Sequence, residues 1–303
     1  MTRPGNDEPG APRYNMPRAN GGGVMKTILA VVGDGAAVSV VETAVAVARR
    51  FGSRITGLNA LASEYAIVFG GEMGFSISSE VDRTLEREGA ERRAQARALF
   101  QSIMRKYGVG IGGGGEGLGA DWREEIGRQN SVAGTLGRVF DLIVVEQPDK
   151  PASFAEATLE DALFESGRPV LMAPRVAPAS VGERVLIAWN GSTETARTVA
   201  FAMPILQRAD RVEVVSVDGA MTPGPSSDEL AKSLKAHGID AASRHIAVGS
   251  RQPGDVFFAE AKAMSADLLV KGAYTQSRLR QMIFGGATRQ IIMGAEIPVL
   301  LAH

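Results

Sequence analysis

Two polar, glycine-containing segments in the C-terminal part of the chain have the residue types that bind a phosphate. Asn190-Gly-Ser192 follows an apolar run, and segment 272–288 begins with Gly272 and carries Gly285-Gly286 directly before a helical pattern. Glycine lets the backbone approach an anion closely, and the free N–H groups of a helix start favour negative charge. Hydroxyl and guanidinium donors accompany them: Ser192, Thr288, Arg278, Arg280 and Arg289. The segments predict an anion site, and the alternative is a plain turn with solvated arginines.

Other kinds of site have little support in the sequence. The chain has no cysteine, which excludes disulfides, thiolate zinc sites and a cysteine nucleophile. The GxxxxGK(S/T) and GxSxG patterns do not occur, and the GxGxxG pattern that begins at Gly33 fails at Val38. The three histidines are dispersed, so we expect no metal site. A formal net charge of −1 argues against a dedicated nucleic-acid binder.

The two candidate loops follow strands of a predicted parallel α/β unit. Continuous apolar runs predict strands at 184–189, 267–271 and 297–302, and further strands are expected at 211–217 and near 241–248. Apolar spacings of three and four predict a helix at 193–207, and another helix is expected near 287–294. Further helices are expected to begin at Ser226 or Ser227 and at Pro253. Apolar strands that alternate with helices indicate a parallel sheet covered on both faces. If the first and fourth strands are neighbours, both loops converge beyond their carboxyl ends, where such sheets bind ligands.

The N-terminal half repeats this pattern. Three anchors recur in the same order: Lys26–Asp34 with Arg184–Ser192, Asp141–Val145 with Asp267–Lys271, and Arg168–Ala173 with Ile297–Ala302. The repeat predicts two tandem five-stranded α/β domains, residues 24–174 and 183–303, joined by a linker at 174–182. No glycine lies between Asp141 and Gly167, so we expect a degenerate site without nucleotide in the first domain.

The remaining segments are expected to lie outside the site. Residues 1–23 contain five glycines and four prolines without an apolar run, which predicts a disordered tail rather than a signal peptide. No stretch reaches 18 consecutive apolar residues, so no membrane partner is expected. A long charged helix is predicted at about 80–106, and the glycine run 112–115 after it predicts a flexible loop.

The residues after the fourth strand of the second domain resemble a motif of the universal stress protein family. Nucleotide-binding members carry G-x2-G-x9-G-(S/T), and these positions fall at Gly272, Thr275, Gly285 and Gly286. Thr275 replaces a glycine and Gly286 stands where Ser or Thr is usual, although Thr288 offers a hydroxyl nearby. The resemblance covers about residues 24–302. It implies two copies of the Rossmann-like, adenine-nucleotide-alpha-hydrolase-like fold.

The resemblance also implies which residues surround the nucleotide. Asn190 replaces the family's acidic residue at the end of the first strand, and Val217 matches a position that packs near adenine. Lys271 and Tyr274 fall within the binding loop, whereas Trp189 is either a pocket residue or a core aromatic. The complete predicted site is Ala188, Trp189, Asn190, Gly191, Ser192, Val217, Lys271, Gly272, Tyr274, Thr275, Gly285, Gly286, Ala287 and Thr288. It includes no catalytic residue and no metal ligand.

The resemblance implies a cytoplasmic stress-response protein that binds ATP or a related adenine nucleotide, with or without Mg, and acts on conformation or partner choice. No convincing base is visible, so at most slow ATP hydrolysis is expected. The alternative is an interaction or structural module that has lost its nucleotide, as the departures at Thr275, Gly286 and Asn190 suggest. The family also implies a homodimer. Within one chain, the final strands 169–172 and 297–301 would pair the two domains.

Overall fold

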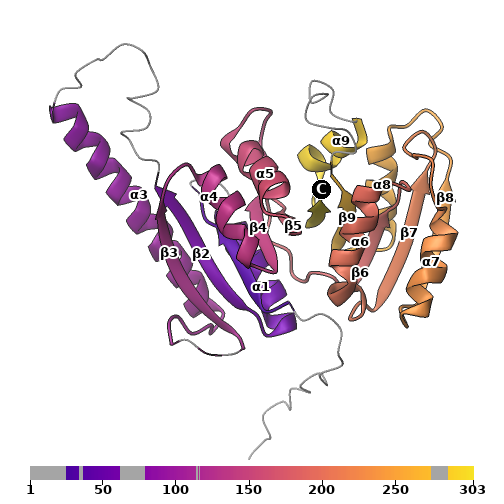
Figure 1. Ribbon diagram of the computed structural model, residues 1–303, viewed down its shortest axis with the longest axis horizontal. Coiled ribbons are helices and arrows are strands. Elements are labelled where there is room, and N and C mark those ends of the chain that lie inside the picture. The colour runs from indigo at the N-terminus through magenta and orange to yellow at the C-terminus, as the bar shows by residue number, and fades with distance from the viewer. Residues whose placement is uncertain (1–24, 34–36, 62–78, 114, 116, 274–285) are drawn as a thin grey trace, which may run out of the picture.

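The computed structural model describes residues 25–33, 37–61, 79–113, 115, 117–273 and 286–303 (Figure 1). The N-terminal half contains β1 (Thr27–Val31), α1 (Ala37–Phe51), β2 (Arg54–Leu61), α3 (Ser79–Lys106), β3 (Gly119–Ile126), α4 (Gln129–Leu136), a 3-10 turn (Gly137–Val139), β4 (Leu142–Glu146), α5 (Phe154–Glu165) and β5 (Val170–Ala173). The C-terminal half contains β6 (Arg184–Ala188), α6 (Thr193–Leu206), β7 (Arg211–Val217), α7 (Ser227–Ala236), β8 (Ala241–Ile246), α8 (Pro253–Ala263), β9 (Leu268–Gly272), α9 (Gly286–Gly294) and β10 (Val299–Ala302).

All of these strands form one sheet in the order β3-β2-β1-β4-β5-β10-β9-β6-β7-β8. Neighbouring strands are parallel except β5 and β10, which are antiparallel. The predicted α/β class with a parallel sheet is therefore confirmed. Strand β1 pairs with β4, and β6 pairs with β9, so the first and fourth strands of each half are neighbours, as convergence of the two loops requires.

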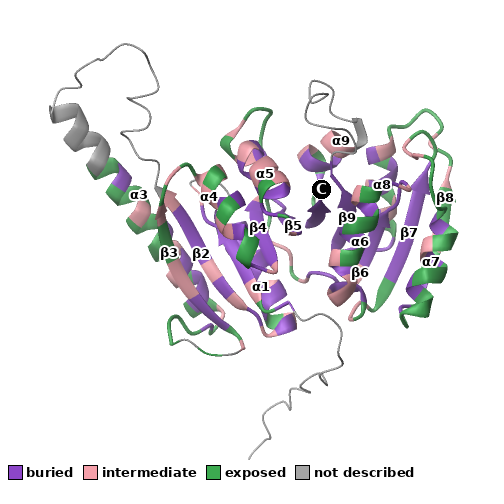
Figure 2. Ribbon diagram, viewed as in Figure 1, coloured by how far each residue is buried: buried purple, intermediate pink, exposed green. Residues whose placement is uncertain are grey.

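Two hydrophobic layers hold the helices on the sheet. One layer packs against α1, α3, α6 and α7, and the other packs against α4, α5, α8 and α9. Strands β4, β5, β9 and β10 are almost wholly buried, as their continuous apolar runs predict, because helices cover both faces. The edge strands β3 and β8 are partly exposed and carry charged side chains, which discourages pairing with other chains (Figure 2).

The predicted element boundaries are close to the observed ones. Strand β7 has the predicted bounds, and Ser226 is the N-cap of α7 in a capping box with Glu229. The long charged helix is α3, and Gly112 and Gly113 lie between it and β3 with positive φ angles. The predicted linker 174–182 contains neither helix nor strand. The tail 1–23 lies outside the described residues, and the division into two domains stays a prediction.

Equivalent residues of the two halves contact each other where the halves meet. Leu171 pairs with Leu300, and each is the leucine of its own Pro-Val-Leu segment. Arg50 donates to the carbonyl of Arg208, and Arg208 Nη1 donates to the carbonyl of Arg50 at 2.7 Å. These arginines are 158 positions apart, as are Lys26 and Arg184, the first residues of the first pair of repeated anchors. The halves are therefore related by a local twofold axis, and the expected pairing of their final strands within one chain is confirmed.

A buried carboxylate before β9 fixes the start of β6. Asp267, which is 8% exposed, accepts a hydrogen bond from Ser180 Oγ at 2.6 Å. It also accepts backbone N–H bonds from Gly182, Glu183 and Arg184 at 3.1, 3.1 and 2.8 Å. We expect Asp267→Ala to lower the free energy of unfolding by about 3 kcal/mol, because buried N–H donors lose a charged acceptor. Urea unfolding measures this loss.

Asp240→Ala is the matched control for this substitution. Asp240 is exposed, so its removal should change the free energy of unfolding by no more than about 0.5 kcal/mol. A loss of less than about 1 kcal/mol for Asp267→Ala would show that water replaces the carboxylate without cost.

Candidate functional site

The turn between β6 and α6 is built from the side chains of Asn190 and Ser192. Asn190 Oδ1 accepts hydrogen bonds from Thr195 Oγ1 at 2.6 Å and from the backbone N–H of Ser192 at 3.2 Å. Ser192 is the N-cap of α6, and its Oγ accepts from the backbone N–H of Thr195 at 3.2 Å. Gly191 has a φ of +78°, a conformation that favours glycine. The side-chain oxygens of Asn190 and Ser192, which were predicted to face a ligand, thus accept hydrogen bonds within the turn. Asn190 Nδ2 has no partner among the described residues.

The loop between β7 and α7 packs on this turn. Thr222 donates its backbone N–H to the Asn190 carbonyl at 2.8 Å, and Trp189 Nε1 donates to the Pro225 carbonyl at 2.8 Å. A Cβ on Gly224 would lie 2.5 Å from the Gly191 carbonyl oxygen, so the two backbones touch. Trp189 is buried in the hydrophobic layer under α6 and α7, which matches its alternative reading as a core aromatic.

Gly272 ends β9 directly against the start of α6. A Cβ at this position would lie 2.4 Å from the backbone nitrogen of Thr195 and 2.5 Å from its Oγ1. No side chain fits in this space unless the backbone moves. The starts of the two predicted loops therefore meet at the carboxyl ends of β6 and β9.

Lys271 is a buried cation beside this contact. Lys271 is only 4% exposed, and its Nζ donates a hydrogen bond to the carbonyl of Gly272 at 3.2 Å. Burial lowers the pKa of Lys271 to about 8, and the negative charge of Glu194 on α6 opposes this shift. Within the described part of the chain, no carboxylate forms an ion pair with Lys271. Its positional counterpart in the N-terminal half is the fully buried Val145.

The remaining predicted site residues are distributed around this centre. Ala188 and Val217 are fully buried in the layer under α8 and α9, and Thr288 is half-buried on α9. Gly286 and Ala287 lie in the first turn of α9. Tyr274, Thr275 and Gly285 lie outside the described residues. The structure thus brings Asn190, Gly191, Ser192, Lys271 and Gly272 together, and the rest of the predicted set stays a prediction.

Sequence reasoning missed three residues that build the site. Thr195 lies between Asn190 and Gly272, and Thr222 and Gly224 hold the β7–α7 loop on the Asn190–Gly191 turn. The sequence Pro-Gly-Pro at 223–225 was the available signal for a tight backbone approach. No local pattern identified Thr195 as a contact of Gly272, because that contact joins distant segments.

The described residues include no group of three or more His, Asp or Glu side chains arranged to hold a metal ion. Among the helices of the described part, none combines the length and apolar character needed to span a membrane.

Comparisons with known proteins agree with this architecture. Residues 182–303 match the model of the Universal stress protein family. Universal stress protein Slr1230 of a Synechocystis strain is 26% identical over 169 residues, which are 53% of this chain and 57% of that protein. The chain therefore spans little more than half the length of this curated relative.

Solved structures show the same fold over most of the chain. A universal stress protein from Archaeoglobus fulgidus superposes with a TM-score of 0.65 at 15% identity, covering 92% of this chain and 96% of that chain. A putative universal stress protein from Pseudomonas aeruginosa superposes with a TM-score of 0.53 at 17% identity, covering 92% and 93%. At these identities the likeness concerns the fold.

Proposed function

We propose that residues 182–303, which match the model of the Universal stress protein family and so support a role in stress response, bind ATP or a related adenine nucleotide. The site lies at the carboxyl ends of β6 and β9, where Gly272 meets the start of α6. Binding acts on the conformation of the protein or on its choice of partner. The proposal includes no catalytic residue and at most slow ATP hydrolysis.

Buried, unpaired positive charge is the observation that carries the proposal. Lys271 is buried without a carboxylate partner among the described residues. Between Asp267 and Glu296 the chain has no acidic residue but four basic ones: Lys271, Arg278, Arg280 and Arg289. Burying an uncompensated charge is costly, and an anionic ligand reduces that cost. Polyphosphate supplies such an anion beside Lys271, near the N-terminal end of α6.

The N-terminal half lacks these features at the equivalent positions. Val145 replaces Lys271, and Glu146 at the end of β4 replaces Gly272. A carboxylate repels phosphate, and a side chain at this position obstructs backbone approach. Gln147 Nε2 instead donates to the carbonyl of Ile292 on α9 at 3.0 Å, so this end of β4 contacts the other half. We therefore propose one nucleotide for each chain.

Calorimetry with ATP and with AMP, with and without Mg, tests the proposal on protein freed of co-purified nucleotide. We expect ATP to bind with a Kd below about 1 mM and Gly285→Leu to weaken it at least tenfold, since the substitution blocks approach of the phosphate. Gly110→Leu is the control, because a Cβ at Gly110 meets no atom within 4 Å. If neither nucleotide binds the wild-type protein at millimolar concentration, the nucleotide proposal fails.

A nucleotide-free interaction module is the second candidate. The β7–α7 loop already packs on the Asn190–Gly191 turn, and Asn190 and Ser192 use oxygen atoms within the protein. Moreover, the seven exposed large apolar side chains of the described residues all lie between Val38 and Val176, with Phe154 93% exposed and Ile126 78% exposed. This candidate assigns the N-terminal half to partner binding.

We also propose a cytoplasmic homodimer that uses surfaces other than β5 and β10.

A further inference from the structure

The side-chain oxygens of the turn between β6 and α6 are occupied by donors of the protein itself. Asn190 Oδ1 accepts two hydrogen bonds, and Ser192 Oγ accepts one from the backbone N–H of Thr195. The backbone N–H of Ser192 can only donate, so it is the oxygen of the Asn190 amide that faces it. Asn190 Nδ2 belongs to the same small amide group and therefore lies at the start of α6, without an acceptor among the described residues.

The backbone carbonyls of this turn are occupied as well. Thr222 donates to the Asn190 carbonyl with its backbone N–H at 2.8 Å and with its Oγ1 at 3.0 Å. The backbone N–H of Ala196 donates to the Ser192 carbonyl at 3.0 Å, and the Gly191 carbonyl oxygen lies against the β7–α7 loop. The turn thus offers a ligand little capacity to accept hydrogen bonds.

Uncommitted hydrogen-bond donors remain at this end of the sheet. Asn190 Nδ2 is one, on a residue that is only 6% exposed. The backbone N–H groups of Thr193 and Glu194 lie in the first turn of α6, too early to find an acceptor within the helix. Lys271 Nζ donates to the Gly272 carbonyl among the described residues, although an ammonium group has further N–H bonds. A ligand group rich in acceptors and poor in donors fits this arrangement.

We propose that this turn binds a phosphate group of the ligand and not its nucleoside, so that the site takes inorganic polyphosphate as well as nucleoside triphosphates. The hydroxyl and amino groups of adenosine need acceptors, and burying such donors without partners is costly. Polyphosphate presents oxygen acceptors and supplies negative charge to Lys271, which has no carboxylate partner among the described residues. The inference rests on the proposed function in placing an anion at this site, but it does not require adenine.

A carboxylate at the start of α6 opposes the bound anion. Glu194 lies in the first turn, where Thr193 Oγ1 donates to its Oε1 at 3.1 Å. Its negative charge also acts on Lys271. We therefore expect Glu194→Gln to strengthen polyphosphate binding by about threefold or more, because it removes like-charge repulsion. Loss of folding cannot produce such a gain.

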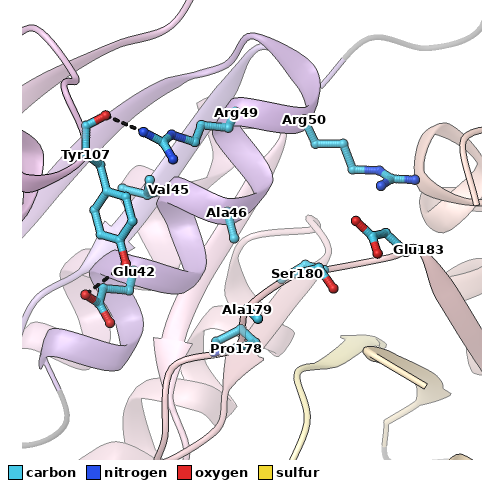
Figure 3. Close-up of a pocket in the computed structure, with 11 residues that line it drawn as sticks. Glu42, Val45, Ala46, Arg49, Arg50, Tyr107, Pro178, Ala179, Ser180 and Glu183 are labelled. Carbon is cyan, nitrogen blue, oxygen red and sulfur yellow. Dashed lines mark hydrogen bonds between the residues drawn. The ribbon is translucent and has the colours of Figure 1, made fainter. Parts of the chain in front are cut away.

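The cavity of about 390 Å³ between α1 and the segment that joins the two halves does not suit a polyphosphate (Figure 3). Arg49 lines it and donates to the Tyr107 carbonyl, but Glu42 and Glu183 line it too, with Glu183 on the side of Arg50. These two carboxylates repel a polyanion. Arg49→Gln should consequently leave polyphosphate binding unchanged, and a tenfold loss in this variant would move the anion to the cavity and overturn the inference.

Calorimetry on the full chain, freed of co-purified nucleotide, compares sodium tripolyphosphate with ATP, GTP and adenosine. We expect tripolyphosphate to bind within about tenfold of ATP, GTP within about threefold of ATP, and adenosine at least about a hundredfold more weakly. The inference is wrong if tripolyphosphate does not bind where ATP does, if adenosine binds within about tenfold of ATP, or if GTP binds more than about tenfold more weakly than ATP. If tripolyphosphate binds and ATP does not, the adenine-nucleotide proposal fails and this inference stands. If neither binds, both are wrong.

Asn190→Asp tests the free donor of the turn. The substitution keeps an oxygen for Ser192 and Thr195 but replaces Nδ2 with a second carboxylate oxygen. It should weaken ATP and tripolyphosphate by the same factor, at least about tenfold. A loss for ATP alone would place the nucleoside at the turn, and undiminished binding of tripolyphosphate would show that Nδ2 does not contact phosphate; either result overturns the inference. Gln95→Glu adds the same charge on the exposed face of α3 and should bind like the wild type. Unchanged far-UV circular dichroism verifies folding.

Discussion

Lys271→Met is expected to stabilise the protein and to weaken nucleotide binding at the same time. The folded state holds Lys271 with a pKa of about 8, against an ordinary value of 10.5, because burial disfavours the charged form. Keeping Lys271 protonated in the folded protein therefore lowers the free energy of unfolding by roughly 3 kcal/mol. Methionine has a similar shape without the charge, and Val145 shows that the equivalent position accepts an apolar side chain. We expect a gain of about 2 kcal/mol at pH 7.

The pH dependence of the free energy of unfolding tests the ionisation of Lys271 independently. Since the folded pKa is below the unfolded pKa, the unfolded chain binds more protons between about pH 8 and 10.5. The wild-type contribution from Lys271 therefore rises with pH through this window, and Lys271→Met should lack that rise. Nucleotide binding should show the opposite trend. An anion prefers protonated Lys271, so wild-type affinity should fall as pH increases above about 8.

Urea unfolding at pH 7 and pH 9.5, together with calorimetry with ATP, measures both effects. Lys262→Met is the control, because Lys262 is an exposed lysine on α8 and should change stability by less than about 0.5 kcal/mol. A less stable Lys271→Met protein at pH 7 would refute the assignment of an uncompensated buried charge. A stabilised variant with undiminished ATP affinity would support the uncompensated buried charge but would show that Lys271 does not contact the nucleotide.

Leu300→Asp is expected to separate the unfolding of the two halves. Leu300 is fully buried in β10, and it pairs with Leu171 at the junction. An unpaired carboxylate at this position loses apolar burial and must be desolvated or protonated, with an expected cost of about 4 kcal/mol. Because the pairing of β5 with β10 joins the two halves of the sheet, the substitution weakens the contact between the halves.

The two tryptophans report this separation directly. Trp122 lies in β3 and Trp189 directly follows β6, so each half contains one fluorophore. Trp122→Phe and Trp189→Phe backgrounds assign the fluorescence change during urea unfolding to one half. We expect one shared transition without Leu300→Asp and two separate transitions with it. Ile126→Asp is the control at a 78% exposed strand end, and it should preserve the shared transition. Two transitions already present without Leu300→Asp would show that the halves are not coupled.

Local sequence patterns were sufficient for most of the architecture. Apolar runs identified the buried strands, and the pair Ser226-Ser227 identified the start of α7. The repeated Pro-Val-Leu segments identified β5 and β10, and the family resemblance implied that these two strands pair. The bounds of β3 were beyond this reasoning, because an edge strand with the sequence GADWREEI buries too few side chains to show an apolar run.

The candidate site was less predictable because its contacts join distant segments. Gly272 could be identified as a close-approach glycine, but its neighbour Thr195 could not. Asn190 was expected to face a ligand, yet its Oδ1 is held by Thr195 and Ser192. The absence of a partner for Lys271 among the described residues depends on the three-dimensional placement of every nearby carboxylate. A sequence motif identifies the residue types in a loop. Whether a buried charge such as that of Lys271 has a partner depends on the residues around it in the folded protein.

The antiparallel pairing of β5 with β10 also determines how this protein responds to dilution. When two separate subunits join by their edge strands, their association is bimolecular and depends on concentration. Here both edges belong to one chain, and the short segment 174–183 between β5 and β6 keeps them close, so the pairing is intramolecular with a high effective concentration. Each chain therefore keeps its own two unlike halves together at any abundance, and subunits cannot be exchanged across this junction.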